Sequence, residues 1–294
     1  KPLTVRRTRT DIENVARYNK DVNGFPKVER PIENRYELNE HLANLFESAM
    51  ETLDKKLSYA RYQAIAYLKP EAANGLYDNA ELISRSLAGI RKNGLVKRLE
   101  SSFYAFQISL NNFRQANQNM IDMFNRDKVF IAPDLDINNL LEAGLSDEEI
   151  EEKLNAKAEE NPKNSVFKAE DFAPEYIELL QQDQEILEKM YTDWEGITDE
   201  DDSKFAKFNE LLKHELFKND RNPEQKLVVF SESVDTVKYL ERRINRKDVL
   251  VISADNRSKL FKTIRENFDA NYKTKLNKYN IILTTDVLAE GVNL

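Results

Sequence analysis

The chain has 294 residues with a net charge of −8, and 40% of the residues are hydrophobic and 33% charged, which is typical of a globular protein with room for two domains. It has no cysteine and only two histidines, His41 and His214, so disulfides and thiolate chemistry are excluded and we predict no metal site. No apolar run approaches the roughly 20 residues that span a bilayer, so we expect no membrane contact and a cytoplasmic location.

The charge is unevenly distributed along the chain. Residues 141–203 carry 21 Asp or Glu against 5 Lys, whereas residues 219–280 carry 14 Lys or Arg against 9 acidic residues. Residues 1–30 are also basic, with 8 Lys or Arg against 4 acidic residues. Two basic ends permit a polyanionic partner despite the acidic total. Lysine-rich helix faces that are merely solvated would give the same counts.

The first two thirds of the chain predict a linker followed by helices. Residues 1–34 are basic and irregular, with Gly24, Pro26 and Pro31 in an extended stretch. From residue 35 the apolar residues recur at helical spacing, in one stripe of Leu38, Leu42, Leu45, Phe46, Ala49, Leu53 and Leu57. Further stripes continue to Phe124 and predict long helices packed on one another, interrupted near residues 70–75 and again around residues 89–94.

Acidic motifs punctuate the stretch between residues 129 and 204. Ser146 and Glu149 form a capping-box pattern that predicts a helix start, and the Asp-Glu-Glu sequence after Ser146 is explained by the helix dipole rather than by magnesium binding. A further helix is expected over residues 175–191. The acidic residues 198–203 lack the alternating carboxylates and central glycine of a calcium loop, so we predict a solvated linker there.

At Lys226 the sequence changes from a series of helices to short strands that alternate with helices. An amphipathic helix over residues 205–217 precedes it, and short apolar strands at 227–230, 249–252 and 281–283 then alternate with helices at 234–244 and 258–268. Strand-helix-strand order predicts a parallel sheet with right-handed crossovers. The predicted fold class is therefore α/β plus all-α, in which a long helical insertion precedes a partial, parallel, three-layer α/β domain.

Small polar side chains follow each predicted strand. They are Ser231, Ser253, and Thr285 with Asp286. Since the carboxyl ends of parallel strands meet at one edge, these side chains are expected on one rim, where open α/β sheets bind ligands. Hydroxyls there could contact a phosphate backbone, aided by helix N-termini. Residues 231–233 could equally cap the following helix, and both can hold together.

Two segments resemble a known family. Residues 226–240 (KLVVFSESVDTVKYL), followed by residues 281–294 (IILTTDVLAEGVNL), resemble motifs IV and V of superfamily-2 helicases in the Snf2-like branch that includes bacterial RapA-type translocases. Residues 5–12 (VRRTRTDI) resemble the segment with which that branch leaves its first RecA-like lobe. Residues 97–102 (KRLESS) are similar to a segment of bacterial members that carry long helical insertions.

The resemblance implies a domain organisation and a function. Residues 1–34 would be the basic linker that leaves the first lobe, residues 35–204 the helical insertion, and residues 205–294 the first part of the second RecA-like domain. The parent would be an ATP-dependent DNA helicase or translocase. It would use ATP and Mg²⁺, contact the backbone of double-stranded DNA, require a missing first lobe, and bind a protein partner at the insertion.

The resemblance also assigns site residues. Asp286, Gly291 and Asn293 of motif V would belong to the nucleotide cleft and its coupling network. Four hydroxyl side chains would contact nucleic acid: Ser231, Ser253, Thr284 and Thr285.

The sequence departs from the family pattern in ways that predict an inactive fragment. Residues 89–94 have the glycine spacing of a phosphate-binding loop, but Leu95 follows in place of lysine and no strand precedes. No strand-end Asp-Glu pair is present for magnesium, and the arginine-bearing motif VI is expected beyond Leu294. Phe261 stands where the family usually has arginine. We therefore expect no catalytic residue and no bound ATP in this chain alone.

The alternative is a non-enzymatic helical interaction module with an appended α/β binding domain, whose acidic middle recruits a basic partner.

Overall fold

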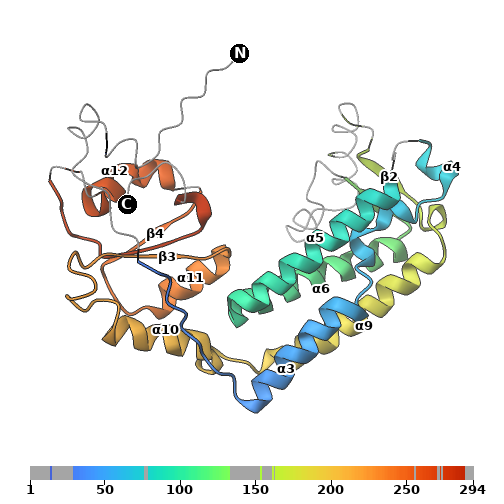
Figure 1. Cartoon of the computed structure of the whole chain (residues 1–294). Helices are drawn as coiled ribbons and strands as arrows, with labels where there is room; N and C mark the ends of the chain where they lie inside the picture. Colours follow the sequence, from blue (N-terminus) through green and yellow to red (C-terminus); the bar gives the residue numbers. More distant parts are fainter. Residues whose placement is uncertain are drawn as a thin grey trace. The chain divides into compact units, whose positions relative to one another are not determined.

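The computed structural model describes residues 29–75, 79–132, 163–254, 256–269 and 274–288, together with Asn14, Lys153, Asn161 and Tyr272. The chain divides into two units, residues 1–36 and residues 37–294. In the first unit, residues 29–36 are exposed and have neither helix nor strand. All elements named below belong to the second unit (Figure 1). The predicted capping box at Ser146 lies outside the described residues.

Three long helices form the helical part. They are α5 (Ala80–Ser101), α6 (Phe103–Asn125) and α9 (Glu175–Glu195), and α6 packs against both of the others. The buried positions of α6 recur every three or four residues, as the stripe in the sequence predicts. The first half of α6 shares a core with Trp194 and Leu187, and its second half shares another with Phe172 and Tyr176.

A run of short turns follows α3 (Glu40–Glu51). The chain continues through a π-helical turn, η1 (Thr52–Lys56), two 3-10 turns, η2 (Ala60–Tyr62) and η3 (Ala64–Ala66), and one turn of helix, α4 (Pro70–Ala73). The predicted helical stripe is therefore wrong between residues 52 and 69. The predicted interruption near residues 70–75 is confirmed, because α4 ends at Ala73 and both Asn74 and Gly75 have left-handed backbones.

A buried carboxylate holds these turns in place. Asp183 of α9 is 1% exposed and accepts hydrogen bonds from the backbone N–H of Ser58 (2.8 Å), the hydroxyl of Ser58 (2.9 Å) and the backbone N–H of Ala60 (2.9 Å). Between them, Tyr59 has a left-handed backbone with φ of 57°, and its hydroxyl donates to the carbonyl of Leu53. Burial raises the pKa of the Asp183 carboxyl, and the hydrogen bonds from Ser58 and Ala60 oppose that rise.

The predicted helix break at residues 89–94 is also wrong. Helix α5 runs through both Gly89 and Gly94 without interruption, because Leu95 and Leu99 on its inner face are buried in the core. A glycine inside a helix costs only about 1 kcal/mol relative to alanine, which such burial outweighs. The break comes instead at Ser102, which is extended and caps α6 by accepting from the backbone N–H of Ala105.

Two further features go beyond the sequence prediction. Strands β1 (Val129–Ile131) and β2 (Ser165–Phe167) pair antiparallel, with a 3-10 turn, η4 (Ala169–Asp171), directly after β2. The acidic segment that follows α9 forms another 3-10 turn, η5 (Asp199–Asp201), and is not simply a solvated linker. Asp199 pairs with Arg242 at 2.8 Å, and the buried Asp202 caps the next helix through the N–H of Phe205.

The α/β part has the predicted parallel architecture. Strands β3 (Leu227–Phe230), β4 (Val249–Ile252) and β5 (Ile281–Thr284) form a parallel sheet in the order β3-β5-β4. Helices α10 (Ser203–His214) and α11 (Val234–Arg243) cover one face, and α12 (Arg257–Phe268) covers the other (Figure 1). The mixed fold of helices plus a parallel α/β sheet is thus confirmed. The predicted boundary between residues 204 and 205 lies inside α10.

Part of α5 is left uncovered by the rest of the described chain. Four large apolar side chains on its first half are exposed: Leu82, Ile83, Leu87 and Ile90. The predicted protein partner of the helical part stays a prediction.

Of the helices that the structure describes, none is both long and apolar enough to cross a bilayer.

Candidate functional site

The register of the sheet aligns the ends of its three strands. Phe230 of β3 and Ile252 of β4 both pair with Thr284 of β5, so the residue after each strand lies in one row. That row contains Ser231, Thr285 and Ser253, in this order, with neighbours separated by about 4.8 Å in the hydrogen-bonding direction. The predicted meeting of these residues at the carboxyl edge is therefore confirmed.

The side chains of this row differ in accessibility. Ser231 and Ser253 are partly exposed, Thr285 is 8% exposed, and Asp286 is exposed at the start of a 3-10 turn, η6 (Asp286–Leu288). Thr284 is fully buried and its hydroxyl donates to the carbonyl of Thr285 at 3.0 Å. Its predicted contact with nucleic acid has no exposed surface to support it.

Two helices begin at the same edge. Ser233 caps α11 by accepting from the backbone N–H of Thr236 (3.2 Å), and the hydroxyl of Ser231 accepts from the N–H of Ser233 (3.1 Å). The capping role considered for residues 231–233 is thus confirmed for Ser233. On the other side, Asn256 precedes α12, and its side-chain oxygen accepts from the N–H of Ser253 (2.8 Å). The positive ends of both helix dipoles therefore lie along the edge, which favours an anionic ligand.

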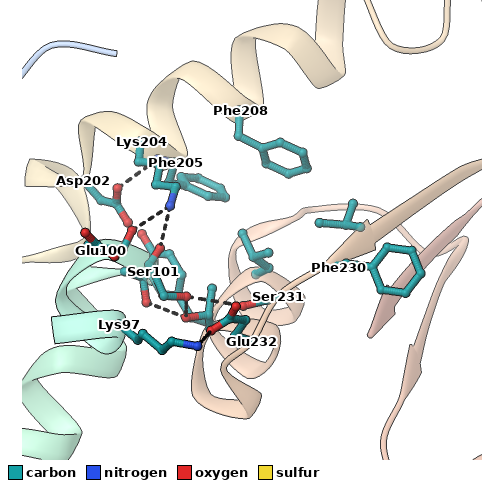
Figure 2. Close-up of a pocket in the computed structure, with 15 residues that line it drawn as sticks. Lys97, Glu100, Ser101, Asp202, Lys204, Phe205, Phe208, Phe230, Ser231 and Glu232 are labelled. Atoms are coloured by element: carbon teal, nitrogen blue, oxygen red, sulfur yellow. Dashed lines mark hydrogen bonds and ion pairs between the residues drawn. The ribbon is translucent and has the colours of Figure 1, made fainter. Parts of the chain in front are cut away.

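The end of α5 docks against the loop after β3. The side chain of Lys97 pairs with Glu232 at 2.8 Å, and Arg98 donates to the backbone carbonyl of Glu232 at 3.2 Å. The hydroxyl of Ser101 shares hydrogen bonds with Thr236 (2.8 Å) and Ser231 (3.3 Å). Figure 2 shows Lys97 and Ser101 of the helical part beside Glu232 and Ser231 of the α/β part. The helical part thus reaches the candidate site directly.

A cleft of about 420 Å³ opens beside this contact. Apolar side chains, including Phe205, Phe208 and Leu240, line it together with the polar residues of the docking contact (Figure 2). Lys204 lies at its wall and donates to the backbone carbonyls of Glu100 (2.8 Å) and Ser101 (3.1 Å). This lysine therefore satisfies carbonyls at the C-terminal end of α5, where a positive charge also complements the helix dipole. Desolvation by burial lowers the pKa of Lys204.

Sequence reasoning missed the involvement of residues 97–102 in this site. The family resemblance singled out the segment, but its apolar spacing indicated only that it lies within a helical stripe. The available signal was the pair of adjacent serines, because a serine that interrupts an apolar stripe is a common helix cap. The partner of the neighbouring serine, Ser101, could not be predicted from local sequence. It is Thr236, which lies more than 130 residues further along the chain.

The described residues give no support for a bound nucleotide or metal. The glycine pair at residues 89–94 lies inside helix α5, so its backbone N–H groups are not arranged as a phosphate-binding loop. Within the described ranges, no three His, Cys, Asp or Glu side chains are grouped as a metal site. Gly291 and Asn293 lie outside the described residues. ATP and Mg²⁺ stay predictions for the parent protein.

Comparison with known proteins adds no further assignment. No family model, curated protein or solved structure matches this chain.

Proposed function

We propose that this chain is part of an ATP-driven, DNA-stimulated helicase or translocase of superfamily 2, and that it carries the nucleic-acid edge of the second RecA-like lobe. The observation that carries the proposal is the row of Ser231, Thr285 and Ser253 at the carboxyl edge of a parallel sheet. The resemblance of the segments at this edge to motifs IV and V points in the same direction.

The chemistry of the edge suits a phosphate backbone. Hydroxyls and the N-termini of α11 and α12 donate hydrogen bonds without reading base sequence, which is how proteins position themselves on a duplex. Asp286, an exposed carboxylate beside the row, would repel phosphate and therefore suits the proposed coupling role better than a DNA contact. We expect DNA binding by this chain alone to be weak, because both RecA-like lobes of such a motor contact DNA and this chain contains part of only the second lobe.

The salt dependence of DNA binding tests the proposal. Fluorescence anisotropy of labelled duplex DNA should show weak binding whose affinity falls roughly tenfold or more between about 50 and 200 mM salt, as expected for two or more phosphate contacts. Binding that ignores ionic strength would contradict the proposed mode. An inert protein of similar net charge serves as the control for nonspecific adsorption.

The proposal also predicts where the remaining motor parts are encoded. The gene should carry a phosphate-binding loop and an Asp-Glu motif before this segment, and an arginine-rich motif VI after it. This chain by itself should not hydrolyse ATP. Absence of those motifs from the gene would favour the alternative, a non-enzymatic interaction module.

A further inference from the structure

The three loops of the carboxyl edge are held in three different ways. Thr285 follows the central strand β5, which has a hydrogen-bonded neighbour on each side. Ser253 is held within its own loop, because the side chain of Asn256 bonds both the N–H of Ser253 and the carbonyl of Val251. Ser231 follows β3, which lies at the border of the described sheet. Its loop therefore has a strand neighbour on one side only.

Within that loop, the hydroxyl of Ser231 accepts from the N–H of Ser233, and the end of α5 adds a contact from outside the loop. The hydroxyl of Ser101 joins Ser231 to Thr236, and Ser102 contacts the same Thr236 hydroxyl at 2.9 Å. Thr236 and Ser102 are 6% and 5% exposed and remain bonded to each other without Ser101, so what the Ser101 hydroxyl adds is the link from this buried pair to Ser231. The pair between Lys97 and Glu232 is exposed and contributes less, because water and salt screen it.

From this geometry we propose that residues 97–102 of the helical part are a positioning element for DNA binding, with Ser101 as the residue that fixes Ser231 at the edge. The inference rests on the proposed function. Without this contact, the loop of residues 231–233 would keep only its local hydrogen bonds and would be held less firmly, so a DNA contact would require further ordering of the loop. Order imposed before binding removes that entropic cost. The helical part would then act on DNA binding without touching DNA itself.

The test combines amide hydrogen exchange with DNA affinity on the whole chain. Ser101→Ala removes the bridging hydroxyl, Ser101→Thr retains one, and Ser86→Ala is the matched control on the exposed side of the same helix. We expect Ser101→Ala to speed exchange of the N–H groups of Ser233 and Thr236 by roughly three- to tenfold, as for the loss of one hydrogen bond, and to weaken DNA binding by a similar factor. Ser101→Thr should restore both, and Ser86→Ala should change neither.

The outcomes separate this inference from the proposed function. If wild-type chain binds DNA and Ser101→Ala binds equally well, or if its exchange is unchanged, the positioning role is wrong and the proposed function stands. If wild-type chain fails to bind DNA at low salt, the proposed function fails and this inference fails with it. Trp194, which packs against Phe103 and Phe106 at the start of α6, reports by its emission whether each variant is folded.

Discussion

At the scale of single residues, the buried carboxylate of Asp183 joins helix α9 to the turns after α3. It accepts three hydrogen bonds from Ser58 and Ala60 and so determines how the turns after α3 meet α9. Its position could not be predicted from the sequence, because an aspartate on an amphipathic helix is ordinarily solvated.

Asp183→Ala should strongly destabilise the chain. It leaves buried donors of Ser58 and Ala60 without an acceptor, and we expect a loss of about 3 kcal/mol in the free energy of unfolding. Urea denaturation measures this loss. Asp193→Ala on the same helix is the matched control, since its pair with Lys189 is largely exposed and is worth about 0.5 kcal/mol. Equal losses in the two variants would contradict the account of the Asp183 contact.

The second residue-scale prediction concerns pH. The hydrogen bond from Arg246 holds the pKa of Asp248 below its ordinary value of 3.8, and the backbone carbonyl of Asp248 accepts from the N–H groups of Asn280 and Ile281 at the start of β5. A lowered pKa means that the ionised carboxylate stabilises the fold above pH 3.8 and that this contribution disappears as pH falls through the folded-state pKa.

The measurement compares wild type with Asp248→Asn by urea unfolding. The stability advantage of wild type should be constant between about pH 5 and 7, where the carboxylate is ionised in both states, and should shrink below about pH 4. An advantage that grows as the pH falls would show that the carboxylate is not held by Arg246 in this way.

At the scale of elements, α5 is the helix whose sequence and structure disagree most. Gly89 and Gly94 both lie inside it, and a Cβ added at either position would meet no atom within 4 Å. Alanine at each should therefore stabilise the chain by about 0.5–1 kcal/mol through helix propensity alone. Thermal or urea unfolding of Gly89→Ala and Gly94→Ala tests this.

Gly75 supplies the control for that prediction. It also has open space around it, but its φ of 71° is a left-handed conformation, so Gly75→Ala should destabilise by about 1 kcal/mol. Destabilisation by all three substitutions would indicate that the helix breaks at residues 89–94, as the sequence alone predicts.

Elements with a clear apolar period could be predicted, and elements defined by distant contacts could not. The strands at Leu227–Phe230 and Ile281–Thr284 follow from short apolar runs, and α6 follows from its regular stripe. By contrast, β1 is a strand only because β2 pairs with it from far along the chain. The edge row at Ser231, Ser253 and Thr285 was predictable because parallel strands place their ends together. The support of Ser231 by α5 was not, because no local pattern encodes which helix end reaches that loop.

At the scale of the whole molecule, residues 37–294 form one compact unit in which the helical part is joined to the sheet. The joining contacts are polar at Ser101 and Thr236 and aromatic at Tyr104 and Tyr239, whose rings stack at 5.5 Å. A helical part attached this closely is positioned to influence the edge of the sheet. The proposed motor therefore has its nucleic-acid edge and its insertion in one body.

The most direct measurement compares the DNA affinity of two variants, one with a negative charge in the carboxyl-edge row and one with the same charge elsewhere on the surface. Ser253→Glu introduces it in the proposed contact row, whereas Thr274→Glu introduces the same charge at an exposed position in the segment between α12 and β5, away from that row. In anisotropy titrations at low salt, we predict at least tenfold weaker binding for Ser253→Glu and less than twofold for Thr274→Glu. Equal weakening by both, or no effect of Ser253→Glu, would contradict the assignment of the carboxyl edge as the DNA-binding surface.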